Sequence, residues 1–169
     1  RSFDELEAAV ADVMGFSHVV PAHQGRGAEN ILYSALLEDG DVALNNTHFD
    51  TTRAHVANQG ADAVDCPVDA AHDPDADAEF KGNFSVDKAR AFVDEHGADA
   101  VPVVILTVTN NSAAGQPVSV ENTRRAAAFA DEIDATFVLD ACRFAENAYF
   151  VTEREAEFAD RSVAEVALE

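Results

Sequence analysis

The stretch "AVPVVILTVT" (100–109) decides the fold, because apolar and β-branched residues follow one another in it without polar alternation. Such a run is typical of a parallel strand that is buried on both faces. We therefore predict a central strand here, in a sheet that helices cover on both sides.

Strands and helices alternate on both sides of this stretch. The predicted strands are "SHVVPA" (17–22), "DVALNN" (41–46), "ADAVDC" (61–66) and "ATFVLDAC" (135–142). The predicted helices cover 2–15, 28–40, 51–60, 85–96 and 120–133, and a further helix begins at 162. In the first of them Ser2 would be the cap, and glycines close 2–15 and 28–40. An exposed Asp-rich segment occupies 72–84. This alternation predicts a single α/β domain with a doubly wound, mostly parallel sheet.

The charge and composition exclude several classes of protein. The chain has 169 residues, with 32 acidic and 11 basic side chains and a formal charge of -21. Nucleic acids and anionic membranes are therefore disfavoured as partners. No apolar run is long enough to span a bilayer, so we expect a cytoplasmic protein. Acidic residues spread along the whole chain also suggest adaptation to high salt. Cys66 and Cys142 lie far apart, support neither a disulfide nor a metal site, and are predicted to be buried.

Polar residues follow the first predicted strand, where ligands bind in doubly wound sheets. Gln24, Gly25 and Arg26 come just before a helix, so backbone N–H groups and a guanidinium would face the same point. This pattern favours an anion site. A tight turn with a solvated arginine is the alternative that the residues leave open.

Other strand ends carry further candidates. Asp140 ends "TFVLD" and would need a cation or donor there, which a ligand or Arg143 could supply. Phe49 and Asp50 follow the 41–46 strand, and a phenylalanine in this position is either core or a flat ring for a ligand. The loop after 100–109 offers three amides, which bind a ligand or only build the turn: Asn110, Asn111 and Gln116. An anion site, a carboxylate and a flat ring together suit a planar, phosphorylated, heterocyclic cation such as pyridoxal phosphate.

Five motifs resemble the aromatic amino acid β-eliminating lyases, in order and over essentially the whole chain. They are "HQGRGAEN" (23–30), "FDTTR" (49–53), "FKGNF" (80–84), "NNSAAGQPVS" (110–119) and "RFAENAYFVTEREAEF" (143–158). The resemblance implies a three-layer αβα fold with a mostly parallel sheet, the fold type I of pyridoxal-phosphate enzymes. It also implies pyridoxal 5'-phosphate as cofactor, a homotetramer, and potassium or another monovalent cation in the full-length enzyme.

The resemblance gives a role to each candidate residue. Gln24, Gly25 and Arg26 would hold the cofactor phosphate, and Phe49 would stack on the pyridine ring. Near the 3-oxygen of the cofactor would lie Asn111 and Arg143. The pyridinium nitrogen would pair with Asp140, and Asp50 would assist when the aromatic group leaves. Asp140, Asp50 and Arg143 are the expected catalytic residues, and no metal ligand is expected.

The substrate implied by the resemblance is an aromatic amino acid. The tyrosine branch of the family usually has Thr where this chain has Asp50, so the tryptophan branch is favoured. The implied reaction converts L-tryptophan to indole, pyruvate and ammonia. The alternatives are a tyrosine phenol-lyase, another pyridoxal-phosphate lyase of fold type I, or a non-catalytic acidic interaction domain.

The chain departs from the family pattern in two respects. The family needs a lysine for the Schiff base with the cofactor, and neither Lys81 nor Lys88 resembles its segment. We therefore expect residues 1–169 to be part of the cofactor-binding large domain, without the lysine segment and the C-terminal small domain, and inactive alone. Ala114 replaces a usual glycine, a change that is tolerated where the backbone does not need a positive φ.

Overall fold

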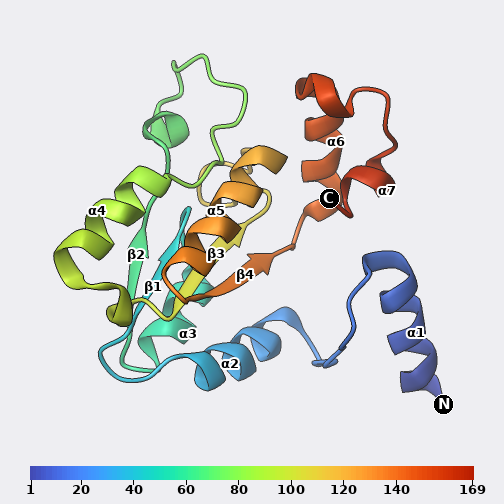
Figure 1. Ribbon diagram of the computed structural model, residues 1–169. Helices are drawn as coiled ribbons and strands as arrows, with labels where there is room; N and C mark the ends of the chain where they lie inside the picture. The colour runs from blue at the N-terminus through green and yellow to red at the C-terminus, as the bar shows by residue number, and fades with distance from the viewer.

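A parallel sheet of four strands forms the middle layer of the computed structural model, which describes residues 1–169 (Figure 1). The strands lie in the order β2-β1-β3-β4. Their bounds are β1 Val42–Asn45, β2 Asp62–Asp65, β3 Val103–Thr107 and β4 Thr136–Asp140. Because all neighbours are parallel, the carboxyl ends of the strands meet at one edge of the sheet.

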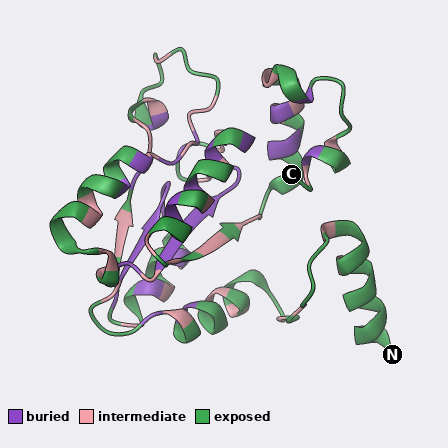
Figure 2. Ribbon diagram, in the orientation of Figure 1, coloured by how far each residue is buried: buried purple, intermediate pink, exposed green.

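The two central strands, β1 and β3, are buried on both faces, as the apolar run 100–109 predicts, whereas the edge strands β2 and β4 are only partly buried. Alternate residues of β3 face opposite layers. Val104 and Leu106 pack with α4 (Val86–His96) and α5 (Val120–Glu132), and Val103 and Ile105 pack with α2 (Gly25–Leu36) and α3 (Asp50–Ala57). All five residues of β3 are buried, and Figure 2 shows this strand as part of the purple centre of the molecule. The three-layer α/β architecture with a mostly parallel sheet is therefore confirmed.

Helices and turns of the layers largely match their predicted segments. Their bounds are α2 Gly25–Leu36, α3 Asp50–Ala57, α4 Val86–His96 and α5 Val120–Glu132. Ser85 and Ser119 cap α4 and α5, since each hydroxyl accepts a hydrogen bond from a backbone N–H three residues on. Short 3-10 helices occur at Asp69–His72, Ala98–Ala100 and Ala156–Phe158.

The helix predicted at 28–40 differs from α2 at both ends. It begins three residues earlier, at Gly25, so Arg26 lies in its first turn. It ends at Leu36, and Gly40 instead belongs to a later turn with φ 90°. The glycine before the second strand therefore serves the turn into β1 and does not close the helix.

The segment predicted as a strand at 17–22 is irregular, so this prediction is wrong. It pairs with neither free edge of the sheet, Pro21 has no N–H to donate, and the Val20 side chain is 81% exposed. Gln24, Gly25 and Arg26 consequently follow an irregular segment and not a strand.

α1 (Ser2–Met14) was predicted as a helix and is one, although its cap differs. Arg1 is the N-cap residue, without a side-chain hydrogen bond, and Ser2 is already helical. The helix ends at Gly15, which adopts φ 70°. None of its residues is buried, and it stands apart from the three layers (Figures 1 and 2).

The C-terminal part forms a small cluster beside the sheet and packs against the start of α5 through Val120. It contains α6 (Phe144–Arg154) and α7 (Val163–Val166), whose side chains pack around Val151 and Phe158. α7 begins with a complete capping box between Ser162 and Glu165. No helix of the chain has the length and apolar character that crossing a membrane requires.

Candidate functional site

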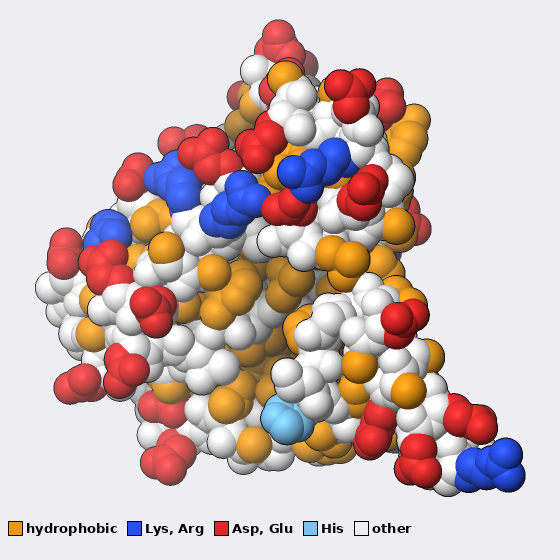
Figure 3. Space-filling view, turned by 45° about the vertical axis from the view of Figure 1, so that its right-hand side comes forward, with side chains coloured by type: hydrophobic (Ala, Val, Ile, Leu, Met, Phe, Trp, Pro, Cys, Tyr) orange, Lys and Arg blue, Asp and Glu red, His pale blue; other side chains and the backbone are white.

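A cavity of about 880 Å³ opens where the start of α2 faces the carboxyl ends of β3 and β4. Figure 3 shows a hollow with hydrophobic side chains on its floor, whereas acidic side chains gather on the outer surface. Its volume is within the range of roughly 300–1,000 Å³ that is usual for small-molecule sites.

Seven of the eight site residues predicted from the sequence line this one cavity. They are Gln24, Gly25, Arg26, Phe49, Asn111, Asp140 and Arg143. They come from four segments that are far apart in the chain, so the fold brings them together. The eighth, Asp50, is the first residue of α3 and does not line the cavity.

The α2 end of the cavity carries the predicted anion site. Gln24 is the N-cap residue of α2, and no side chain caps this helix. The backbone N–H groups of Gly25 and Arg26 have no acceptor in the protein, which leaves them free to bind a ligand. A helix N-terminus with a nearby guanidinium is suited to an anion.

Asp140 lies at the opposite side, at the end of β4. One oxygen of its carboxylate accepts a weak hydrogen bond of 3.3 Å from the backbone N–H of Cys142. It forms no ion pair with Arg143, so the internal pair that the sequence left open is absent. Burial, with the Glu29 charge as a smaller cause, raises the pKa of Asp140 above its ordinary value. A cationic group in the cavity would supply the missing partner.

Phe49 and Asp50 begin α3, on the wall beside α2. Phe49 is the N-cap residue, and its side chain lines the cavity while remaining 36% exposed. It is therefore not a core residue. The Asp50 carboxylate accepts a hydrogen bond of 2.7 Å from the backbone N–H of Thr51, at the helix start.

The three amides of the 110–119 loop have different roles. Asn110 is fully buried and builds the turn, because its side chain accepts from the Ala113 N–H and donates to Thr47. Gln116 pairs with Asn110 through the backbone and does not line the cavity. Asn111 faces the cavity. Only one of the three amides is thus placed to meet a ligand.

Ala114 lies in the same loop and adopts φ 59°. This position does require a positive φ, so the condition under which alanine is tolerated there is not met. In this conformation alanine is less stable than glycine by about 1 kcal/mol.

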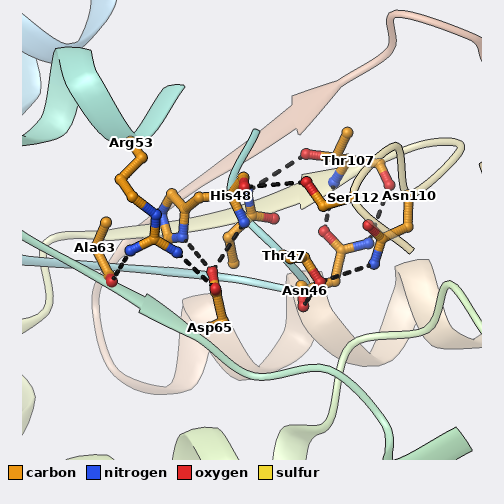
Figure 4. A network of polar contacts seen from close by, with 10 residues as sticks. Asn46, Thr47, His48, Arg53, Ala63, Asp65, Thr107, Asn110 and Ser112 are labelled. Carbon is orange, nitrogen blue, oxygen red and sulfur yellow. Dashed lines mark hydrogen bonds and ion pairs between the residues drawn. The ribbon is translucent and has the colours of Figure 1, made fainter. Parts of the chain in front are cut away.

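Asn46 follows β1 directly and links it to the end of β3 (Figure 4). Its side chain donates to the carbonyl oxygens of Thr107 (3.0 Å) and Gly82 (2.8 Å) and accepts from the Thr107 N–H (2.9 Å). The amide thereby continues the strand ladder by one step beyond the last paired residue of β1. This contact fixes the segment that leads to Asn111.

His48 is held in the neighbouring network of Figure 4. Its Nδ1 lies 2.7 Å from Asp65, which also accepts from the His48 backbone N–H and from Arg53. Burial lowers the pKa of His48, so the imidazole is neutral and donates from Nδ1 to the carboxylate. The network fixes the backbone just before Phe49.

The sequence reasoning missed several residues that line the cavity, among them Glu29, Tyr33 and Cys142. Arg26, Glu29 and Tyr33 are spaced by three and four residues, so helical periodicity from Arg26 could have identified them. Burial, followed by the charges of Glu29 and Asp140, raises the pKa of Tyr33. Cys142 is exposed, contrary to prediction, because the chain leaves the sheet after Asp140; Cys66 is buried as predicted.

Neither lysine of the chain reaches the cavity. The ammonium group of Lys81 donates to the carbonyl oxygen of Asp73, and that of Lys88 pairs with Asp69 and donates to the carbonyl of Pro67. No group of three or more His, Cys, Asp or Glu side chains is arranged to hold a metal ion.

Comparison with protein families and curated sequences gives matches along the whole chain. A family model described as "Beta-eliminating lyase" matches residues 1–167. The chain is 69% identical over 168 residues to a probable tryptophanase of Halobacterium salinarum, and 52% identical over 168 residues to a tryptophanase of Salinibacter ruber. It is 45% identical over 169 residues to a tyrosine phenol-lyase of Pasteurella multocida. These alignments cover 99%, 99% and 100% of the chain, but only 38%, 36% and 37% of the relatives.

Two solved structures share the fold at low sequence identity. The SepCysS-SepCysE N-terminal domain complex aligns with a TM-score of 0.62 and 14% identity, over 81% of this chain and 35% of that chain. Substrate-bound BacF from Bacillus subtilis aligns with a TM-score of 0.55 and 19% identity, over 80% of this chain and 33% of that chain. The α/β architecture described above is thus found in other proteins.

Proposed function

The chain belongs to the beta-eliminating lyase family, and from this premise we propose that it carries the cofactor site of a tryptophan-cleaving lyase. The proposed cofactor is pyridoxal 5'-phosphate, and the proposed products are indole, pyruvate and ammonia. The chain spans about 38% of the length of its Halobacterium relative, so the activity is proposed for a longer protein that contains these residues.

The observation that carries the proposal is the convergence of seven predicted residues on one cavity. The cavity has donors for an anion at the start of α2 and a carboxylate without a cationic partner at the end of β4. A ring at its wall is partly exposed. These three features suit the phosphate, the ring nitrogen and the flat face of pyridoxal phosphate.

At the α2 end, Gln24, Gly25 and Arg26 would bind the phosphate. The backbone N–H groups of Gly25 and Arg26 and the Arg26 guanidinium would donate to phosphate oxygens. The positive end of the α2 dipole adds to this attraction. These residues would anchor one end of the cofactor and so fix where its ring lies.

At the β4 end, Asp140 would hold a proton on the ring nitrogen. Pyridoxal phosphate, when bound, supplies a ring that accepts the electrons released when the substrate Cα proton leaves. The Asp140 carboxylate would keep that nitrogen protonated, and the positive nitrogen would in turn keep Asp140 ionised despite its burial. Burial raises the pKa of Asp140 above its ordinary value, so a cation beside it would stabilise its charged form.

Phe49, Asn111 and Arg143 would orient the ring. Phe49 would stack on its face, and Asn111 and Arg143 would donate to its 3-oxygen. Arg143 is the N-cap residue of α6 and lines the cavity beside Asp140. Orientation of this kind contributes to catalysis by limiting the motion of the reacting groups.

The choice of tryptophan over tyrosine is supported by sequence similarity and by Asp50. The chain is more similar to the probable tryptophanase than to the tyrosine phenol-lyase, at 69% against 45% identity. The chain has Asp50 where the tyrosine branch of the family usually has Thr, and this residue lies at the helix start beside Phe49, outside the cavity lining. We propose that Asp50 assists departure of the indole.

Several properties of the complete protein are part of the same proposal. The Schiff-base lysine would come from outside residues 1–169, because Lys81 and Lys88 do not reach the cavity. The complete enzyme would be a homotetramer that uses potassium or another monovalent cation. It would lie in the cytoplasm.

The test is an assay of the complete protein with pyridoxal phosphate and either L-tryptophan or L-tyrosine. We expect indole and pyruvate from tryptophan, and loss of this activity in Asp140→Ala with pyridoxal phosphate still bound. Phenol release from tyrosine at a higher kcat/KM would replace the proposal by a tyrosine phenol-lyase. Full turnover by Asp140→Ala would reject the role of that carboxylate.

A further inference from the structure

Glu29 joins the two helices that form one side of the cavity. It lies on α2, three residues after Arg26 and on the same face, and it lines the cavity. Its carboxylate accepts from the Thr51 hydroxyl at one oxygen (2.9 Å) and from the Thr52 hydroxyl at the other (2.5 Å). Both threonines belong to the first turn of α3.

These two contacts are the side-chain hydrogen bonds that connect α2 with α3. Below them, apolar packing among Tyr33, Leu37 and Val56 holds the far parts of the helices together. On its other side, the start of α3 is held by the contacts of Asp65 with His48 and Arg53. The carboxylate of Glu29 supplies the polar contacts between this start and α2, and it also lies 3.9 Å from Nε2 of His55 in α3.

The start of α3 carries the ring that lines the cavity. Phe49 is its N-cap residue, two positions before Thr51. The start of α2 carries the free N–H groups of Gly25 and Arg26. The bridge made by Glu29 thus joins the segment that carries the free N–H groups to the segment that carries the Phe49 ring.

We propose that Glu29 is a positioning residue: by binding Thr51 and Thr52 together, it fixes the Phe49 ring relative to the anion site and so determines how tightly the cavity holds pyridoxal phosphate. This inference rests on the proposed function. The negative charge of Glu29 also lies near Tyr33 and Asp140. After burial, it is a further cause of the raised pKa values of both residues.

The experiment measures pyridoxal phosphate binding to the complete protein by visible absorbance and circular dichroism, without substrate. Glu29→Ala removes both acceptors, and the loss of two bonds to a charged group should weaken binding by about tenfold or more. The visible circular dichroism of the bound cofactor should fall as the ring loses its fixed environment. Glu29→Gln can still bond both threonine hydroxyls and should bind within about threefold of the unaltered protein.

A matched control separates positioning from stability. Glu155 also joins two elements, since its carboxylate accepts from the Val120 N–H at the start of α5 (2.8 Å), but it does not line the cavity. Glu155→Ala should lower the unfolding midpoint of the complete protein and leave cofactor affinity and circular dichroism unchanged.

A second variant pair keeps the inference testable if Glu29→Ala does not fold. Thr51→Val with Thr52→Val removes the donors and keeps the carboxylate, and it should weaken binding as Glu29→Ala does. Adding Glu29→Gln to this pair should cause no further loss, because the bridge is already broken. Full affinity and unchanged circular dichroism in either Glu29→Ala or the threonine pair would overturn the inference.

The outcomes also separate this inference from the proposed function. If the unaltered protein binds pyridoxal phosphate and Arg26→Ala weakens binding while Glu29→Ala does not, only the role of Glu29 is wrong. If the unaltered protein does not bind pyridoxal phosphate, the proposed function is wrong and the inference falls with it.

Discussion

Replacing Asn46 by alanine is expected to lower the free energy of unfolding by about 3 kcal/mol. The side chain is fully buried and makes three hydrogen bonds of 2.8–3.0 Å, two of them to the backbone of Thr107. Alanine would leave the Thr107 N–H and C=O without these partners, and each buried unpaired group costs about 1–3 kcal/mol. The carbonyl oxygen of Gly82 would keep a longer contact with the Asn110 side chain (3.4 Å), so the loss of its bond to Asn46 adds little to the loss of stability.

The assay is equilibrium unfolding of the 169-residue chain in urea, followed by far-ultraviolet circular dichroism. With a denaturant dependence of about 2 kcal/mol per molar, the midpoint should fall by about 1.5 M. Asn58→Ala is the control, because Asn58 is exposed at the end of α3, and it should change stability by less than about 0.5 kcal/mol. An Asn46→Ala midpoint no lower than that of Asn58→Ala would refute the reasoning that this amide completes the strand ladder.

Three further outcomes are expected from the same unfolding measurement. Ala114→Gly should stabilise the chain by about 1 kcal/mol, because φ is 59° there, and an unchanged or lower midpoint would contradict this. The midpoint should rise with KCl between about 0.1 and 2 M, since salt screens the charge of -21; equal stability at both concentrations would argue against adaptation to high salt. The pKa of His48 is lowered from 6.5 in the folded chain, so as pH falls the unfolded chain binds a proton at this histidine before the folded chain does. The free energy of unfolding therefore decreases as pH falls below 6.5. His48→Asn keeps a donor to Asp65 but does not titrate, so its stability should fall less between pH 7 and pH 5.5 than that of the unaltered chain; parallel losses would contradict a neutral His48.

The layers of the fold could be predicted from local sequence, because a parallel strand buried on both faces needs an apolar run. The run 100–109 gave β3, and serines before apolar segments marked the starts of α4 and α5. The segment 17–22 was wrongly predicted because a strand also needs a neighbour to pair with, and nothing in six residues tells whether one is there. Helix α6 was identified only as part of a motif, without a predicted boundary.

Site residues could be predicted where a charged or polar side chain stands at the end of a predicted strand or at the start of a predicted helix. Asp140 and the Gln24, Gly25 and Arg26 turn are of this kind, and all of them line the cavity. Asn46 and Glu29 were not predicted, since their roles depend on partners 22 to 61 residues away in the chain. Long-range hydrogen bonds of this kind leave no local pattern, although the spacing from Arg26 to Glu29 does place both on one helix face.

The most direct test of the account is a crystal structure of the complete protein with pyridoxal phosphate bound. We expect the phosphate against the N–H groups of Gly25 and Arg26, and the ring nitrogen within about 2.6–3.2 Å of an Asp140 oxygen. We also expect the ring face on Phe49. A cofactor bound outside this cavity, or with its phosphate toward Asp140, would contradict the central claim.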